Sequence, residues 1–209
     1  MEEQVVVMEH VWKSFGKEQV LRDVNLVINA GEIFGVVGNN GSGKTVLMKS
    51  ICGFVKPDSG KITVCGKQIG RQVDFPESMG IIIESPGFLN SLSGYENLKI
   101  LASLKGIIGK KKIRETIRRV GLDPFMRKPV GKYSLGMRQR LGIAQAIMED
   151  PKLLILDEPF NGLDRNGVGE MRQLLRELKE QGKAILLASH NAADIEELCD
   201  RVHDMENEW

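Results

Sequence analysis

The chain has 209 residues, of which 42% are hydrophobic and 27% are charged, and its formal net charge is +1. This composition is typical of a soluble globular protein with one substantial domain. The near-zero net charge gives no general attraction to nucleic acid or to an anionic membrane. No apolar run approaches the roughly 20 residues that cross a bilayer. We therefore expect a cytoplasmic protein that binds no nucleic acid and reaches a membrane only through a partner.

The first third of the chain predicts strands, then a loop and a helix. The apolar run 33–38 ends in glycine and is typical of a strand buried on both faces of a parallel sheet. The expected elements of this part are strands over 5–7, 24–28, 33–38 and 61–64, turns over 29–32 and 56–60, and a helix over 44–53.

From about residue 93 the apolar residues recur at helical spacing, and buried-strand patterns return over 153–159 and 184–189. The helical stripes are Tyr95, Leu98, Leu101 and Ala102, then Ile113, Ile117 and Val120, and finally Met171, Leu174, Leu175 and Leu178. Strand–loop–helix units on both sides of a helical block predict an α/β fold. We expect one domain over 1–209, with a core of 1–87 and 151–209 and an inserted helical subdomain of 88–150.

A glycine-rich segment, GNNGSGKT, stands between a predicted strand and a predicted helix. It fits the phosphate-loop pattern G-x-x-x-x-G-K-[ST], which requires that context. Glycines let backbone N–H groups turn toward phosphates, and the helix N-terminus adds positive potential. We expect Lys44 to reach the β- and γ-phosphates of a nucleoside triphosphate and Thr45 to ligate Mg²⁺. The loop residues are Gly38, Asn39, Asn40, Gly41, Ser42, Gly43, Lys44 and Thr45.

Three polar residues stand at the carboxyl ends of the two later buried strands. Asp157 ends the run LLILD, and its carboxylate is a hard oxygen ligand suited to Mg²⁺. Glu158 comes next, placed to polarise an attacking water. His190 follows the second strand and could contact the γ-phosphate or orient that water. The alternatives are a surface Asp-Glu pair before a proline turn and a structural histidine.

A second anion-binding candidate is the segment YSLGMRQR at 133–140. Ser134 is a natural N-cap, Gly136 permits close backbone approach, and the helix start is positively polarised. From these residues alone, an ordinary capped amphipathic helix is an equally good interpretation.

Together with the phosphate loop, LLILDEP, NGLD at 161–164 and ASH at 188–190, this segment resembles the ATP-binding subunit of ABC transporters over essentially the whole chain. The resemblance implies a P-loop NTPase (RecA-like) core with an N-terminal antiparallel β subdomain and an inserted α-helical subdomain. It implies ATP and Mg²⁺ as cofactors, a transmembrane permease, and a peripheral place on the inner face of the cell membrane.

The resemblance also implies that two copies pack head to tail. Ser134 and Gly136 of one copy would then complete the ATP site of the other, with Asp164 at the interface. Phe15 matches the aromatic residue that stacks on adenine, and the alternative for it is a core position. The resulting expectation is an ATPase whose sites are shared across a dimer.

The sequence departs from the family pattern at several points. The usual Ser-Gly-Gly-Gln is here Ser-Leu-Gly-Met, and Glu84 stands where most members carry a Gln that touches Mg²⁺. These features resemble the branch of bacitracin and lantibiotic self-protection, which suggests export of antimicrobial peptides or drug-like compounds. The family usually continues beyond the last residues present here, so we expect either a naturally short chain or a truncated one.

Two further hypotheses stay open. A soluble ABC ATPase acting on DNA or ribosomes usually carries long inserts or two fused copies, and a P-loop small-molecule kinase would lack the segment at 133–140. The basic run 109–121 could contact a membrane surface or a peptide. We interpret it as a solvated helix face, because Ile113 and Ile117 give it a buried stripe.

Overall fold

The computed structural model of the protein describes residues 3–84 and 86–206, so the ends of the predicted domain lie outside it. In the described part, an antiparallel sheet has the strand order β2-β1-β4-β5 and a parallel sheet has the order β6-β7-β8-β3-β9. The antiparallel strands are β1 (Gln4–Phe15), β2 (Glu18–Asn29), β4 (Ser59–Val64) and β5 (Lys67–Gln68). The parallel strands are β3 (Ile33–Val37), β6 (Met79–Ile82), β7 (Leu153–Asp157), β8 (Ala184–Ala188) and β9 (Arg201–Asp204).

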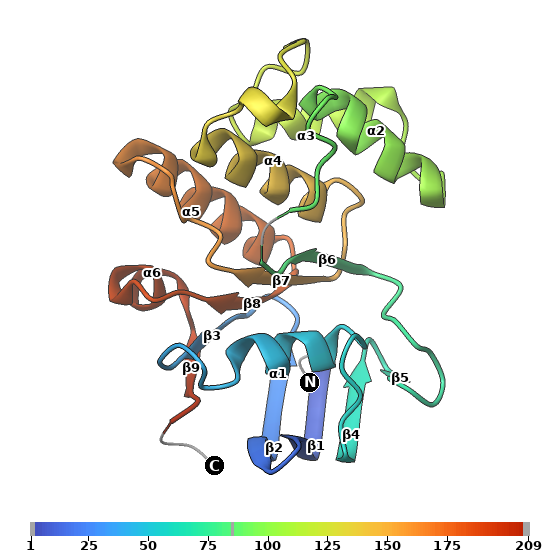
Figure 1. The fold of residues 1–209 in the computed structure, drawn as a ribbon, viewed down its shortest axis with the longest axis vertical. Coiled ribbons are helices and arrows are strands. Elements are labelled where there is room, and N and C mark those ends of the chain that lie inside the picture. Colours follow the sequence, from blue (N-terminus) through green and yellow to red (C-terminus); the bar gives the residue numbers. More distant parts are fainter. Residues whose placement is uncertain (1–2, 85, 207–209) are drawn as a thin grey trace.

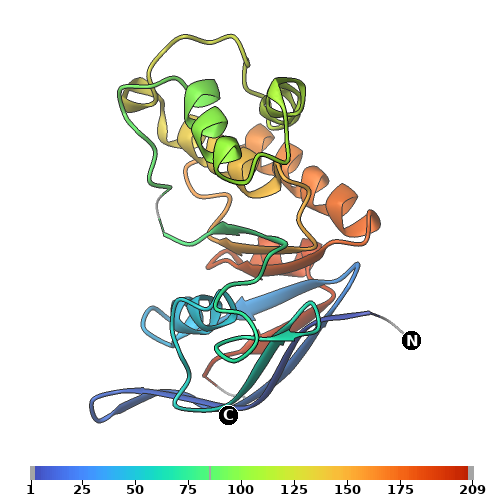
Figure 2. The ribbon, with the colours of Figure 1, turned by 90° about the vertical axis from the view of Figure 1, so that its right-hand side faces the viewer.

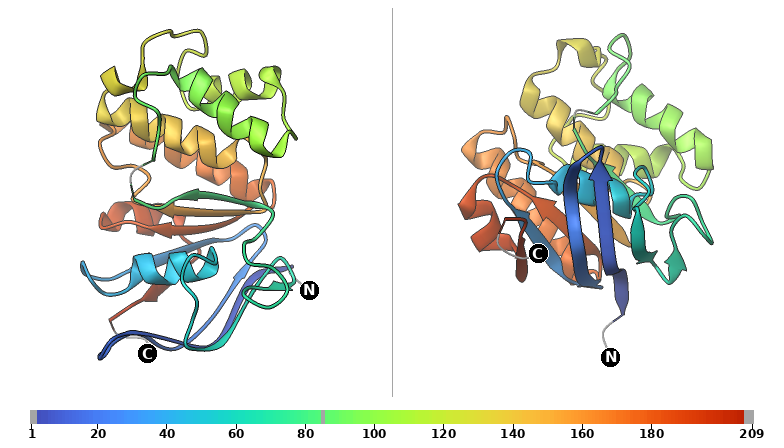
Figure 3. Two further views of the ribbon diagram at one scale, coloured as in Figure 1. Left: turned by 45° about the vertical axis from the view of Figure 1, so that its right-hand side comes forward. Right: turned by 60° about the horizontal axis from the view of Figure 1, so that its bottom comes forward.

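The helices divide between the two faces of the parallel sheet. They are α1 (Lys44–Ile51), α2 (Gly94–Lys105), α3 (Lys110–Arg119), α4 (Leu135–Ile147), α5 (Arg165–Glu180) and α6 (Ala192–Leu198), with a 3₁₀ turn over Val130–Lys132. Figures 1 and 2 show the helical block α2–α4 above the parallel sheet, with α1 and the antiparallel sheet below it. Figure 3 shows the same order of layers from two further directions.

Two hydrophobic cores meet at the parallel sheet, because successive strand residues point to opposite faces. Leu154 and Leu156 of β7 pack with α5 and the helical block, whereas Leu153 and Ile155 pack with α1 and the antiparallel sheet. All four side chains are buried. The expectation of strands buried on both faces is therefore confirmed, and so is the predicted α/β class with an inserted helical block.

Element ends follow local chemistry. The strand expected over 153–159 stops at Asp157, because Glu158 adopts φ 49° and Pro159 has no N–H for the ladder. The strand expected over 33–38 stops at Val37, before Gly38 at φ 144°. β1 and β2 extend well beyond the predicted 5–7 and 24–28, because backbone pairing between the two strands also includes polar residues that the apolar pattern does not mark. Strands β6 and β9 and helix α6 were not among the predicted elements.

Candidate active site

The phosphate loop connects β3 to α1 at the carboxyl edge of the parallel sheet (Figure 1). Gly43 stands at the N-cap of α1 with φ 100°, and no side chain caps that helix start. A side chain at Gly43 would meet the Val20 carbonyl oxygen at 3.0 Å. The sequence thus leaves the first N–H groups of α1 without a side-chain partner, and a helix start of that kind binds anions.

Lys44 folds back over its own loop. Its Nζ donates to the carbonyl oxygen of Gly38 at 2.6 Å and to that of Asn39 at 2.9 Å. The ammonium group is therefore held among the loop residues, where the pattern predicts phosphate oxygens.

Asp157 lies beside Thr45, whose Oγ1 is 3.4 Å from Oδ2 of the carboxylate. Burial raises the pKa of Asp157, and the nearby Glu84 carboxylate adds to the rise, against the lowering effects of the Thr45 hydroxyl and of Lys44. Among the described residues, no group of three or more His, Cys, Asp and Glu side chains forms a ready-made metal site. The donors present are hard oxygens, which fit a Mg²⁺ ion that also takes phosphate and water ligands.

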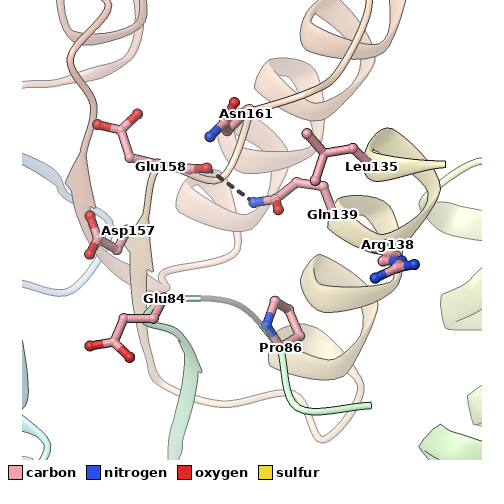
Figure 4. Close-up of a pocket in the computed structure, with 8 residues that line it drawn as sticks. All are labelled: Glu84, Pro86, Leu135, Arg138, Gln139, Asp157, Glu158 and Asn161. Atoms are coloured by element: carbon pink, nitrogen blue, oxygen red, sulfur yellow. Dashed lines mark hydrogen bonds between the residues drawn. The ribbon is translucent and has the colours of Figure 1, made fainter. Parts of the chain in front are cut away.

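Glu158 and His190 form a direct pair. One carboxylate oxygen accepts from the His190 backbone N–H at 2.8 Å, and the other lies 2.7 Å from ring Nδ1. The Glu158 backbone is fixed as well: its N–H donates to the Ala188 carbonyl at 2.9 Å, and its carbonyl accepts from Gln139 Nε2 at 3.0 Å (Figure 4). Two adjacent strand ends, β7 and β8, thus place the predicted acid and histidine together.

A buried network supports the His190 loop, and the sequence analysis did not find it. Asp194 in α6 is 3% exposed; its Oδ2 accepts from the Ser189 hydroxyl at 2.8 Å, and its Oδ1 accepts from Arg172 Nε at 3.0 Å. Ser189 Oγ in turn accepts from the Asn191 backbone N–H at 3.2 Å. The only signal in the sequence was a short polar segment after a buried strand, which does not identify partners in α5.

Glu84 follows β6 at φ 62° and pairs with Lys49 of α1, Nζ to Oε1, at 2.6 Å. The Lys49 ammonium therefore already offsets the extra negative charge that this position carries. Figure 4 shows a pocket with Glu84, Asp157 and Glu158 along one side and α4 residues along the other. Its lining residues are Glu84, Pro86, Leu135, Arg138, Gln139, Asp157, Glu158 and Asn161.

The predicted second anion site begins α4. Ser134 Oγ accepts from the Met137 N–H at 3.2 Å, which makes Ser134 the N-cap, and a side chain at Gly136 would meet the Gly162 carbonyl oxygen at 2.8 Å. Asp164 caps α5 by accepting from the Gly167 N–H at 2.9 Å. Within the part of the chain described here, none of these residues forms a hydrogen bond with the phosphate loop.

Phe15 ends β1 and is 51% exposed, so it is not a core residue. The Lys13 ammonium lies 5.3 Å from its ring centroid. Phe15 pairs with Glu18 across the β1–β2 hairpin, and the same hairpin places Val20 against Gly43. The aromatic ring therefore stands on an element that packs against the phosphate loop.

Comparison with known proteins decides the family. The profile of the ABC transporter family matches residues 21–161. This chain belongs to the ABC transporter family. The uncharacterised ABC transporter ATP-binding protein YdbJ of Bacillus subtilis (strain 168) is 45% identical over 97% of this chain and 66% of its own length. The bacitracin transport ATP-binding protein BcrA of Enterococcus faecalis is 43% identical over 95% of this chain and 65% of its own.

The chain thus spans about two thirds of the length of these two relatives. A lantibiotic transport ATP-binding protein, SrtF of Streptococcus pyogenes, is 39% identical over 92% of this chain and 83% of its own length. A solved ATP-binding subunit of an ABC transporter superposes with a TM-score of 0.86 at 28% identity, covering 96% of this chain and 85% of that one. Across residues 3–84 and 86–206, no helix has the length and apolarity needed to span a membrane.

Proposed function

We propose that the protein is the ATP-hydrolysing subunit of an ABC exporter and that each of its ATP sites is completed by a second copy. The observation that carries this proposal is the Glu158–His190 pair at 2.7 Å, which stands at the sheet edge where the phosphate loop also lies. A carboxylate held in one orientation beside a triphosphate site can accept a proton from an attacking water.

The chain's own residues divide the work. Lys44 and the N–H groups at the start of α1 bind the β- and γ-phosphates, and Phe15 stacks on adenine. Thr45, Asp157 and Glu84 would hold Mg²⁺, which when bound offsets phosphate charge. Glu158 orients and polarises the water, and His190 fixes Glu158 through two contacts. Positioning and charge stabilisation then provide most of the rate enhancement.

The second copy enters through the start of α4. Ser134 Oγ accepts one hydrogen bond within its own chain, so its hydroxyl hydrogen is still able to donate to an anion. Since the phosphate loop of the same chain forms no hydrogen bond with Ser134 among the described residues, the γ-phosphate of a partner copy is the anion we assign to it. Asp164 and residues 161–163 lie beside this helix start and would join the interface.

The test of catalysis is Glu158→Gln, which keeps the side-chain shape but removes the base. We expect ATP-dependent dimers by size-exclusion chromatography and a turnover about 10² to 10⁴ times lower. Glu180→Gln, at the exposed end of α5, is the matched control. In the wild type, shared sites predict that specific activity rises with protein concentration. Unimpaired hydrolysis by Glu158→Gln, or full activity in a strictly monomeric protein, would refute the proposal.

The names of the relatives support a proposal for the transported class. BcrA and SrtF are named for bacitracin and lantibiotic transport, so we propose an antimicrobial peptide or drug-like compound as substrate. The protein would then sit on the cytoplasmic face of the membrane, bound to a permease. Co-expression with a candidate permease, followed by co-purification and growth in bacitracin or a lantibiotic, tests this part. Protection by the wild type but not by Glu158→Gln is the expected result.

A further inference from the structure

The segment 104–128, which we call the distal segment, concentrates the positive charge of the chain. Nine of its 25 residues are Lys or Arg and two are Asp or Glu, whereas the whole chain has 29 basic and 28 acidic residues. Outside the segment, 20 basic residues therefore face 26 acidic ones. Figures 1 and 3 place the segment, which contains α3, at the end of the molecule farthest from the antiparallel sheet. The protein is electrostatically polarised in spite of its net charge of +1.

The charges of α3 point outward because its other face is buried. Ile113, Thr116 and Ile117 are buried, and the lysines at its start are exposed. Part of the charge is paired: Lys105 with Glu149, Lys111 with Glu115 at 3.9 Å, and Arg119 with Glu177. Six basic residues of the segment form no ion pair with any carboxylate in the described chain: Lys110, Lys112, Arg114, Arg118, Arg127 and Lys128.

Exposed apolar side chains lie within the same segment. Leu104 is 78% exposed and Ile107 is 62% exposed, and the two flank the turn that leads into the lysines of α3. Phe125 is 60% exposed, with the Arg114 guanidinium 5.0 Å and the Arg118 guanidinium 5.6 Å from its ring centroid. A purely solvated helix face needs no such residues. Exposed apolar side chains in the same segment as lysines and arginines fit a surface that enters the headgroup region of a bilayer.

We propose that the distal segment binds an anionic phospholipid surface directly, through Lys110, Lys111 and Lys112 to the headgroups and through Leu104, Ile107 and Phe125 to the acyl boundary. This replaces our interpretation of the basic run as a solvated face, which took account of Ile113 and Ile117 but not of the apolar residues outside α3. It also replaces the expectation, drawn from the net charge, that the protein reaches a membrane only through a partner. An acidic protein partner would satisfy the charges, but it gives no reason for Leu104 and Ile107 to stand beside them. The proposal goes beyond the ATPase, because lipid binding requires neither nucleotide nor permease.

The experiment measures co-sedimentation of the purified protein, without nucleotide, with two kinds of vesicle. One contains equal parts of phosphatidylcholine and phosphatidylglycerol, and the other contains phosphatidylcholine alone. We expect binding to the anionic vesicles only, decreasing as salt is raised. Each Lys near an anionic surface contributes about 1 kcal/mol. Lys110→Gln with Lys111→Gln and Lys112→Gln should therefore weaken binding about a hundred-fold.

Lys56→Gln with Lys61→Gln and Lys67→Gln removes the same charge from exposed positions outside the segment, in and beside the antiparallel sheet, and should change binding less than about two-fold. Leu104→Ser with Ile107→Ser should weaken binding at every salt concentration, because it removes apolar area rather than charge. Equal binding to both vesicles, equal losses in both lysine variants, or no vesicle binding by the wild type would overturn the proposal. The last outcome would assign the segment to an acidic protein. None of these results bears on ATP hydrolysis, so the two proposals fail separately.

Discussion

The starts of α1 and α4 are both glycine-containing helix N-termini, but they differ in whether a side chain caps them. The start of α1 has no side-chain cap, and Gly43 adopts φ 100°. The start of α4 is closed by the Ser134 hydroxyl, and Gly136 packs against the Gly162 carbonyl. At a helix start without a cap, the first backbone N–H groups have no side-chain acceptor and can bind an anion. At a capped start, a side chain already accepts from one of these N–H groups, so a ligand would bind in addition to the cap.

This difference separates two kinds of site residue. At α1 no side chain occupies the N–H groups of the helix start, so these groups are available to a ligand. At α4 each candidate residue also has a structural role: Ser134 as a cap, Gly136 as a close contact, and Asp164 as the cap of α5. A substitution at Gly136 therefore disturbs the 161–164 loop whether or not a second copy binds. Tests of the shared site have to preserve these intrachain contacts.

The largest effect is expected at α1 from Lys44→Met. The substitution removes the ammonium that lies on the loop carbonyls and would contact phosphate oxygens. We expect ATP binding and turnover to fall about a hundred-fold or more, as for loss of one preorganised charge-stabilising group. Titration with a fluorescent ATP analogue and a phosphate-release assay measure the two. Lys61→Met, in the antiparallel sheet, is the control, and equal behaviour of both variants would remove Lys44 from the site.

The next effect concerns α4 and uses two substitutions that both keep the cap. Asn and Asp cap helices about as well as Ser, but Ser134→Asp places a negative charge where the partner's γ-phosphate is expected. In the Glu158→Gln background, we expect Ser134→Asp to weaken ATP-dependent dimers at least about ten-fold more than Ser134→Asn does. Analytical ultracentrifugation with and without ATP measures the difference. If the two variants dimerise equally well, the head-to-tail arrangement is wrong.

Many of the strands and helices could be predicted from the sequence, because continuous apolar runs and helically spaced apolar residues indicate directly which residues are buried. The runs over 33–38, 153–159 and 184–189 all became parallel strands buried on both faces. β9 was missed because it is a short edge strand whose four residues include only one apolar residue, Val202.

The sequence pattern could not predict which polar side chains pair with each other. Lys49 meets Glu84 across 35 residues, and Arg172 meets Asp194 from a different helix. Such pairs depend on how elements pack, which spacing along one element does not specify. The phosphate loop, by contrast, is local in sequence, so its residues and its place between a strand and a helix were both predictable.

A smaller effect is expected on stability from Asp157→Asn. The pKa of Asp157 is raised in the folded protein, chiefly by burial, so the folded state holds this proton more tightly than the unfolded chain does. Its ionised form therefore destabilises the fold. The penalty develops as pH rises from the ordinary carboxyl range to the raised value, and it is complete above that value.

Because Asn carries no charge, the variant should unfold a few degrees higher than the wild type at neutral pH without nucleotide. The gain should shrink as pH is lowered toward the ordinary carboxyl range. Calorimetry across that pH interval checks the sign. A variant that is less stable than the wild type at neutral pH would show that Asp157 contributes more through Thr45 than it costs by burial.

The smallest effect is expected on the Mg²⁺ dependence of ATP binding, from substitutions in the Glu84–Lys49 pair that joins β6 to α1. Glu84→Gln removes a negative charge near the predicted phosphates, and Lys49→Met exposes that charge. The quantity to compare is ATP affinity with Mg²⁺ divided by ATP affinity in a chelator. Because Glu84 is largely exposed, we expect this ratio to change only about two- to five-fold, falling in Glu84→Gln and rising in Lys49→Met. If Lys49 acts only by offsetting the Glu84 charge, the double variant should have the same ratio as Glu84→Gln alone. A return to near the wild-type ratio, which is the product of the two single changes, would mean that the two side chains act independently on the nucleotide.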